Sequence, residues 1–311
     1  MTMTIILAAT LAPATLAARP ITAPGPGGEL AGTFIDAGPA TPVVLIIPGS
    51  GPTDRDGNNP LGITAASYRL LAEGLAARGV SSVRIDKRGM FGSKAAIADG
   101  NAVTIADYTD DARNWSATIR KATGAKCVWL LGHSEGGLVA LAAAQQPDGI
   151  CGVISVSAAG RKIGAVMREQ FRANPANAPI LDAALSAIGQ IEAGKRVDSA
   201  SLPAAVRPLF AEAVQPYLID LFSHDPAALA ASLQVPLLII QGDRDLQTTP
   251  EDAAALAAAQ PKATLAILPG VNHVLKVPAG THRQTNIAAY ADASLPIAGS
   301  VVDAAAAFVK R

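Results

Sequence analysis

The sequence predicts an α/β fold with a doubly wound, mostly parallel β-sheet and helices on both faces. From Val43 onward, short aliphatic runs alternate with longer alanine-rich segments of helical period. The aliphatic runs are continuous, as in parallel strands that are buried on both faces. Strands that alternate with helices form right-handed crossovers, which place helices on both sides of the sheet.

The composition agrees with a large buried core and excludes other classes of protein. The 311 residues are 50% hydrophobic and only 16% charged, and 25 basic side chains balance 25 acidic ones. Globular chains carry about 25% charged residues and disordered chains carry more, so this chain should fold. Nucleic-acid binding depends on the attraction of basic side chains for phosphate groups. This chain has zero net charge and no basic run, so nucleic acid is not an expected partner.

The first 18 residues are typical of a secretory signal peptide, with an apolar run followed by small residues. The run has no Lys or Arg before it, which departs from the usual pattern. We expect a periplasmic or secreted protein, with a cytoplasmic protein as the alternative. The run is shorter than the roughly 20 residues of a membrane-spanning helix, and no later segment qualifies, so no transmembrane span is predicted.

The predicted elements follow one another along the chain. Residues 29–37 are expected to form an antiparallel first strand, which Gly-Pro and Thr-Pro pairs terminate. Crossover helices are predicted over residues 65–78 and 104–121 from their helical spacing. The core strands are predicted at residues 43–48, 80–86, 127–132, 152–157, 235–240 and 263–268.

The two cysteines each begin an apolar run, and one helical segment joins these runs. Cys127 and Cys151 should therefore lie side by side at the start of neighbouring parallel strands. One disulfide is possible in an oxidising compartment. Two buried free thiols are the favoured alternative, because adjacent parallel strands strain such a bridge.

A helical cap is predicted over residues 158–234, between two core segments at residues 19–157 and 235–311. This stretch is far longer than an ordinary crossover helix of about 10 to 15 residues. Apolar residues recur at helical spacing from Ile163 to Phe171 and from Leu181 to Ile191, and prolines divide the second half into short pieces. Such a cap would lie over the carboxyl edge of the sheet, where open α/β sheets bind ligands.

The strongest chemical signal is the G-x-S-x-G sequence from Gly132 to Gly136, directly after one predicted strand and directly before a helix. A strand-to-helix turn this tight forces strained φ and ψ angles on Ser134, and it leaves no room for a Cβ at the two glycines. Ser134 would stand at the helix N-terminus, where backbone N–H groups favour developing negative charge. The motif predicts a nucleophilic serine.

A serine nucleophile needs a base that an acid orients, and in this fold they follow in the order Ser, Asp or Glu, His. His273 is the predicted base and Asp245 the predicted acid, because each follows a predicted strand and adjacent strand ends meet at one edge. Asp243 is the alternative acid, and is otherwise expected to brace its turn. His282 is the alternative base, in a less defined loop.

The tetrahedral intermediate also needs two N–H donors. One is expected from Glu135, the residue after the nucleophile. The other is expected from Ser50, which follows the predicted strand 43–48, because the flanking Gly49 and Gly51 let the backbone approach an oxyanion.

The remaining polar motifs suggest no metal or cofactor. His133 is expected to pack and hydrogen-bond inside the elbow, and His224 to lie in the cap. The stretch from Asp54 to Asn58 resembles a calcium loop but lacks the Gly and Glu spacing that such a loop requires. No Cys/His cluster and no G-x-G-x-x-G after a strand is present, so neither a metal nor a dinucleotide is implied.

Together these motifs resemble the α/β-hydrolase superfamily, and within it the bacterial serine esterases that carry PGSGPxDRDGN, GHSEG and GDxDxQ sequences. The similarity spans residues 28–311, and the Asp86-Lys87-Arg88-Gly89 stretch resembles the family's D-x-RG loop, with one extra residue in the spacing that follows. The resemblance implies Ser134 as nucleophile, Asp245 as acid and His273 as base.

The sequence therefore predicts a carboxylic ester hydrolase that acts through an acyl-enzyme on a small-molecule ester and needs no cofactor. An amidase or peptidase and an acyltransferase on the same residues are the enzymatic alternatives. A catalytically silent binding module with the same fold is the non-enzymatic one. The scarce charge and aliphatic cap favour a small or medium apolar acyl group. We make no prediction of oligomeric state.

Overall fold

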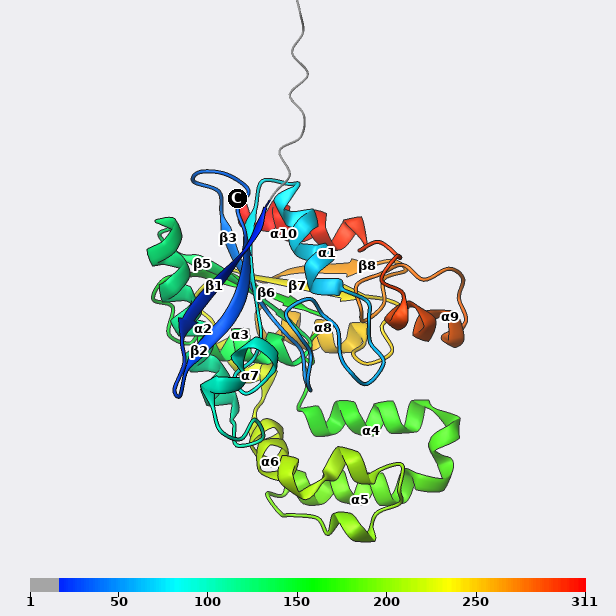
Figure 1. Ribbon diagram of the computed structural model, residues 1–311. Helices are drawn as coiled ribbons and strands as arrows, with labels where there is room; N and C mark the ends of the chain where they lie inside the picture. Colours follow the sequence, from blue (N-terminus) through cyan, green and yellow to red (C-terminus); the bar gives the residue numbers. More distant parts are fainter. Residues whose placement is uncertain (1–16) are drawn as a thin grey trace, which may run out of the picture.

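The computed structural model describes residues 17–311, so the predicted leader lies outside the described residues except for its last two. Eight strands form one sheet in the order β1-β2-β4-β3-β5-β6-β7-β8 (Figure 1). The strands are β1 Ala18–Pro24, β2 Glu29–Ile35, β3 Val43–Ile47, β4 Ser81–Ile85, β5 Val128–His133, β6 Ile150–Val156, β7 Leu237–Gly242 and β8 Thr264–Leu268.

The sheet confirms the predicted fold class. Strands β3 to β8 pair in parallel, whereas β1 and β2 join antiparallel at one edge. All residues of β3, β4 and β7 are buried, which explains the continuous aliphatic runs of β3 and β7, whereas β4 also buries Ser81, Ser82 and Arg84. The parallel strands bring their carboxyl ends, and the loops that follow them, to one edge of the sheet.

Helices cover both faces of the sheet, and the two faces form separate hydrophobic clusters. Helices α1 and α10 pack together on one face, and α2, α3 and α8 lie on the other (Figure 1). The α-helices are α1 Ser67–Ala76, α2 Ile105–Thr123, α3 Glu135–Ala143, α4 Ile163–Ala173, α5 Leu181–Glu192, α6 Gln215–Ser223, α7 Pro226–Ala231, α8 Pro250–Ala259, α9 Arg283–Ala288 and α10 Gly299–Val309. Within residues 17–311, none of these helices is both long and apolar enough to cross a membrane.

Strand β1 is an element that the sequence did not predict. It contains Pro20 and Pro24, which lower the strand propensity of the segment. Proline is tolerated on an edge strand, where the missing N–H faces away from the sheet. β1 pairs only with β2, so it occupies such an edge.

The cysteines form a disulfide between Cys127 and Cys151, which corrects the preference for two free thiols. The expectation of strain assumed regular parallel pairing. Instead the register of β5 and β6 shifts, so that Val128 pairs with Ile150 and Trp129 pairs with Gly152. Cys151 is the extra residue of this irregularity, and the two Cα atoms lie 5.1 Å apart, a separation that a disulfide spans.

Residues 158–234, called the helical segment below, lie between β6 and β7. They contain helices α4 to α7 and four short 3₁₀ helices, η2 Pro175–Ile180, η3 Ser199–Ser201, η4 Arg207–Phe210 and η5 Glu212–Val214. Both predicted apolar stripes are helical, and Val166, Ala184, Ile188 and Ile191 are buried. Helices α4, α5 and α6 form a layer beyond one edge of the sheet (Figure 1).

Candidate active site

Ser134 occupies the turn between β5 and α3, where φ is 55° and ψ is −120°. This is a strained backbone conformation for a residue with a side chain. The turn is also closely packed. A Cβ on Gly132 would overlap the carbonyl oxygen of Gly136, and a Cβ on Gly136 would overlap that of Ile47. The two glycines are therefore required by contacts, and the turn holds Ser134 at the N-terminus of α3.

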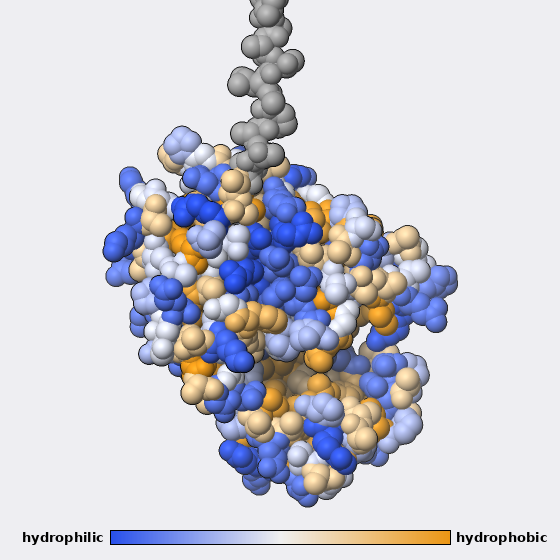
Figure 2. Space-filling view, in the orientation of Figure 1, coloured by the Kyte–Doolittle hydropathy of each residue, from blue (hydrophilic) through white to orange (hydrophobic). Residues whose placement is uncertain are grey.

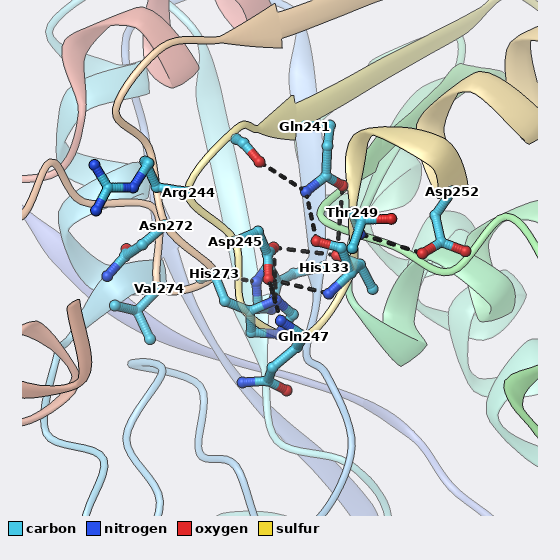
Figure 3. Close-up of polar contacts among 12 residues, drawn as sticks. His133, Gln241, Arg244, Asp245, Gln247, Thr249, Asp252, Asn272, His273 and Val274 are labelled. Atoms are coloured by element: carbon cyan, nitrogen blue, oxygen red, sulfur yellow. Dashed lines mark hydrogen bonds and ion pairs between the residues drawn. The ribbon is translucent and has the colours of Figure 1, made fainter. Parts of the chain in front are cut away.

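His273 and Asp245 come from the loops after β8 and β7 and meet at the sheet edge. The Nδ1 atom of His273 lies 2.8 Å from Oδ2 and 3.1 Å from Oδ1 of Asp245. Both residues are buried, at 5% and 8% exposure. Figure 3 shows the Asp245 carboxylate directed at His273, whereas Arg244 between the two candidate acids extends away.

The surroundings of Asp245 keep its carboxylate ionised. Burial alone raises its pKa, but the neighbouring His273 and hydrogen bonds from His273, Gln247 and Thr248 outweigh burial and hold the pKa below its usual range. The backbone N–H groups of Gln247 and Thr248 donate to Oδ1 at 2.7 and 3.1 Å. An ionised Asp245 only accepts hydrogen bonds, so the His273 proton lies on Nδ1 and Nε2 is left as an acceptor.

The alternative candidates lie elsewhere. Asp243 accepts a hydrogen bond from the N–H of Gly270 at 2.7 Å, so its carboxylate braces the β7 loop against the β8 loop. His282 is exposed on the loop before α9. His224 lies at the C-terminal end of α6, with Nε2 3.7 Å from Oδ2 of Asp220.

Two backbone N–H groups flank Ser134. Among residues 17–311, neither the N–H of Ser50 nor that of Glu135 has a hydrogen-bond partner. Glu135 is the first residue of α3, so its N–H is one of the unsatisfied donors of the helix N-terminus. Gly49 lies against the serine turn, since a Cβ there would be 3.2 Å from Cβ of Ser134.

One cavity of about 680 Å³ joins these residues. Ser134, His273 and Ser50 lie in its wall, and the helical segment contributes mainly apolar residues, such as Met167 of α4 and Leu218 of α6. Figure 2 shows the molecule hollowed between the sheet core and the helical segment, with hydrophobic residues at the rim. Within residues 17–311 no hydrogen bond joins the Ser134 side chain to His273. Such bonds are often long before substrate binds.

A chain of hydrogen bonds in the cavity wall includes Tyr68, a residue that sequence analysis did not single out. The hydroxyl of Tyr68 accepts from the N–H of Gly49 at 2.9 Å and lies 2.8 Å from Nδ1 of His133. Nε2 of His133 lies 2.8 Å from the carbonyl oxygen of His273. The Tyr68 proton therefore goes to Nδ1, and Nε2–H of His133 donates to the carbonyl of His273.

This arrangement keeps His133 neutral. Burial, and to a lesser extent the neighbouring His273, lower the pKa of His133 from 6.5 to about 3. Both of its ring nitrogens are also occupied, as expected for a residue that packs and hydrogen-bonds inside the elbow. His133 connects the loop after β3 to the backbone of the loop that carries His273.

A second residue without a predicted role is Lys87, directly after β4. Its ammonium group donates to the carbonyl oxygen of Gly49 at 2.8 Å and to Oε1 of Glu135 at 3.1 Å. The side chains of Lys87 and Glu135 are only 5% and 4% exposed. No local sequence pattern indicates these contacts, because they join the loops after β3 and β4 to the N-terminus of α3, which are far apart in the chain.

The Asp54–Asn58 stretch has structural partners. Arg55 pairs with Asp86 at 2.7 Å, and Asp56 pairs with Arg84 at 2.8 Å. Asp54 accepts from the N–H groups of Asp56 and Asn58. Across residues 17–311, no group of three or more His, Cys, Asp or Glu side chains is placed to hold a metal ion.

Comparison with known proteins places this geometry in a family. The chain matches the model of the alpha/beta hydrolase family over residues 43–289. It is 27% identical over 215 residues to Esterase EstD of Thermotoga maritima, and the match covers 68% of this chain and 48% of that protein. The chain thus spans about half the length of this relative.

Solved structures share the fold. The esterase Pf2001 of Pyrococcus furiosus is 18% identical with a TM-score of 0.54, and the match covers 85% of this chain and 87% of that one. The alpha/beta hydrolase GrgF from Penicillium sp. sh18 is 19% identical with a TM-score of 0.57, and the match covers 83% and 91% of the two chains. The sheet, the strained serine turn and a family match over most of the chain lead to one conclusion: this protein belongs to the alpha/beta hydrolase family.

Proposed function

We propose that this protein is a carboxylic ester hydrolase that acts through a covalent acyl-serine intermediate. The observation that carries the proposal is the convergence on one cavity of a strained serine turn, a buried His–Asp pair and two N–H groups that have no partner within residues 17–311. The esterase names of several relatives agree with it. The similarity of its motifs to those of bacterial serine esterases gives further support.

In this mechanism Nε2 of His273 accepts the proton of Ser134 Oγ as the oxygen attacks the ester carbonyl. Negative charge then develops on the carbonyl oxygen, and the N–H groups of Ser50 and Glu135 donate to it. His273 returns the proton to the leaving alcohol when the carbon–oxygen bond breaks. Water then attacks the acyl-enzyme as His273 takes its proton, and His273 returns that proton to Ser134 Oγ when the carboxylic acid leaves.

Asp245 holds the imidazole with Nδ1–H turned toward its carboxylate and stabilises the positive charge that His273 gains. The buried carboxylate is ionised before the reaction begins, so it accepts the hydrogen bond from Nδ1–H without any proton transfer to or from Asp245. Its lowered pKa supports this role.

The helical segment is the proposed cap that selects the substrate. Most of its residues that line the cavity are apolar, among them Met167 and Leu218, beside the polar Arg161, Gln170 and His224. Such a wall favours a small or medium aliphatic acyl group over a charged one. The Cys127–Cys151 disulfide supports export to an oxidising compartment, as proposed from residues 1–18.

The proposal is tested by hydrolysis of p-nitrophenyl esters from acetate to dodecanoate, alongside the matching p-nitroanilides. We expect turnover of the esters to be highest for short or medium chains. Turnover of the anilides should be at least about a hundredfold lower. Faster anilide turnover would establish the amidase alternative. Transfer of the acyl group to added alcohol in preference to water would establish the acyltransferase, and no covalent adduct or turnover on any substrate would indicate a binding module.

A further inference from the structure

The ammonium group of Lys87 is buried against both segments that supply the proposed N–H donors. It contacts the carbonyl oxygen of Gly49 at 2.8 Å and the carboxylate of Glu135 at 3.1 Å. The Gly49 carbonyl belongs to the same peptide group as the N–H of Ser50. Lys87 therefore contacts the peptide that supplies one donor and the side chain of the residue that supplies the other.

Because a peptide group is planar, the contact of Lys87 with the Gly49 carbonyl also fixes the direction of the Ser50 N–H. In a trans peptide the C=O and N–H bonds point in opposite directions, and the described residues contain no cis bond. When Lys87 holds the carbonyl of Gly49, the N–H of Ser50 must point the other way. The preceding peptide is also held, because the N–H of Gly49 donates to the hydroxyl of Tyr68 at 2.9 Å.

This segment needs such a restraint. Glycines flank Ser50 on both sides, and glycine gives the backbone wide rotational freedom. Gly51 already has a φ of +69°, in the left-handed region. A rotated Gly49–Ser50 peptide would present a carbonyl oxygen where the reaction needs a donor. A charged partner on the carbonyl disfavours that rotation, and it polarises the peptide so that its N–H becomes a stronger donor.

Stability alone explains the buried pair poorly. The desolvation penalty of two buried charges often cancels their attraction, so a buried ion pair is weak evidence for a stabilising role. The negative charge of the Glu135 carboxylate also affects a neighbouring side chain. Burial, together with the Glu135 carboxylate, raises the pKa of the Tyr217 phenol on α6.

We propose that Lys87 is a positioning residue that holds the Gly49–Ser50 peptide with its N–H turned toward the carbonyl oxygen of the substrate. It acts on formation of the oxyanion and not on binding of the ester. The inference rests on the proposed function, since it assigns a role within that reaction.

The test uses Lys87→Met, which removes the charge and the donor but keeps a side chain of similar length. Lys87→Gln keeps a neutral donor. We expect kcat on a short ester to fall 10²- to 10³-fold in Lys87→Met with KM within about threefold, the loss typical of one oxyanion donor, and to fall less in Lys87→Gln. Equal kcat in Lys87→Met and the wild type would overturn the inference.

Two further variants separate this effect from misfolding. Lys87→Met leaves the Glu135 carboxylate buried without its partner, so Lys87→Met/Glu135→Gln removes both charges and should show the same loss of kcat. Gln215→Met is the matched control, since Gln215 is also fully buried and also donates to backbone carbonyls, those of Val197 and Phe210. Its loss should lower the unfolding midpoint but leave kcat within about threefold. A matching fall of kcat in this control would contradict a specific role for Lys87.

Inhibitor affinity supplies a readout that a purely structural role would not move. A trifluoromethyl ketone adds to the nucleophilic serine and forms an oxyanion, whereas the matching alcohol only occupies the cavity. We expect the Ki of the ketone to rise about a hundredfold in Lys87→Met and that of the alcohol to change less than threefold. Equal effects on both ligands would overturn the inference while leaving the proposed function intact. A ketone that binds the wild type and Ser134→Ala equally would instead contradict the proposed function, and the inference with it.

Discussion

The two sides of the cavity are built in different ways. On the sheet side, hydrogen bonds between distant segments fix the geometry, as in the chain from Tyr68 through His133 to the backbone of His273. On the side of the helical segment, mostly apolar side chains, such as Met167 of α4 and Leu218 of α6, line the cavity. Hydrogen bonds set both distance and direction, whereas apolar contacts tolerate changes of shape.

This difference separates two properties of the proposed enzyme. Rate should depend on the sheet side, where a small displacement misaligns the reacting groups. Substrate choice should depend on the helical segment, where the wall can change without disturbing those groups. Substitutions on the two sides should therefore have different kinetic signatures.

The largest effect is expected on the sheet side from Asp245→Asn. The amide cannot serve as the ionised acceptor of the His273 Nδ1 proton, so the imidazole loses its working tautomer. We expect kcat on a short ester to fall about 10⁴-fold with the fold intact by circular dichroism. A loss of less than tenfold would show that Asp245 does not orient the base.

Gly136→Ala tests the packing of the serine turn. A Cβ there overlaps the carbonyl oxygen of Ile47, so the backbone must move. We expect the free energy of unfolding in urea to fall by more than about 3 kcal/mol. The control is Gly299→Ala, because nothing lies within 4 Å of a Cβ at that position. It should change stability by less than about 1 kcal/mol, and similar losses in both variants would contradict the account of the turn.

Acid should destabilise the sheet side through His133. Its pKa is about 3 in the folded protein and 6.5 ordinarily, so between these values the unfolded chain binds the extra proton. The contribution of His133 to the free energy of unfolding is therefore fully present above about pH 6.5, and it decreases as the pH falls toward 3. Each pKa unit is worth about 1.4 kcal/mol, so the contribution is a few kcal/mol.

Urea unfolding from pH 7 to 4 measures this contribution. His133→Gln should be less stable than the wild type at pH 7, but its stability should decrease less steeply with acid. His282→Gln, which replaces an exposed imidazole, should follow the wild-type curve. Parallel curves for His133→Gln and the wild type would contradict the account.

Substitutions in the helical segment should have the smallest effect on rate. Met167→Ala and Leu218→Ala shorten two apolar side chains of the wall and so enlarge the cavity. We expect the ratio of kcat/KM for octanoate to that for acetate to change about tenfold, with kcat on acetate within about threefold of wild type. A hundredfold fall of kcat on acetate would show that the wall also positions the catalytic groups, and the comparison would fail.

Sequence patterns predicted the parts of the molecule that are formed by contiguous residues. The aliphatic runs predicted the parallel strands, and the elbow sequence predicted where Ser134 lies, because the strand, turn and helix are contiguous. Strand β1 was not predicted, since Pro20 and Pro24 argue against a strand unless its edge position is known. The disulfide depended on a one-residue irregularity in strand pairing that no periodicity reports.

The supporting residues of the site had no detectable signal in the sequence. Tyr68 lies in α1 at a position that looks like core, and its hydroxyl contacts Gly49, 19 residues before it, and His133, 65 residues after it. Lys87 lies in a recognised loop, yet its role depends on a carbonyl 38 residues away. Contacts between distant segments follow from the packed sheet, so only the structure identifies them.

The most direct test of the proposed mechanism is covalent labelling by a fluorophosphonate, followed by intact-mass measurement and peptide mapping. We expect one phosphonyl group per chain, attached to Ser134, with ester hydrolysis lost in proportion. Ser134→Ala should take up no label and should hydrolyse no ester above background. Label on another residue, or wild-type turnover by Ser134→Ala, would contradict the assignment of Ser134 as the nucleophile.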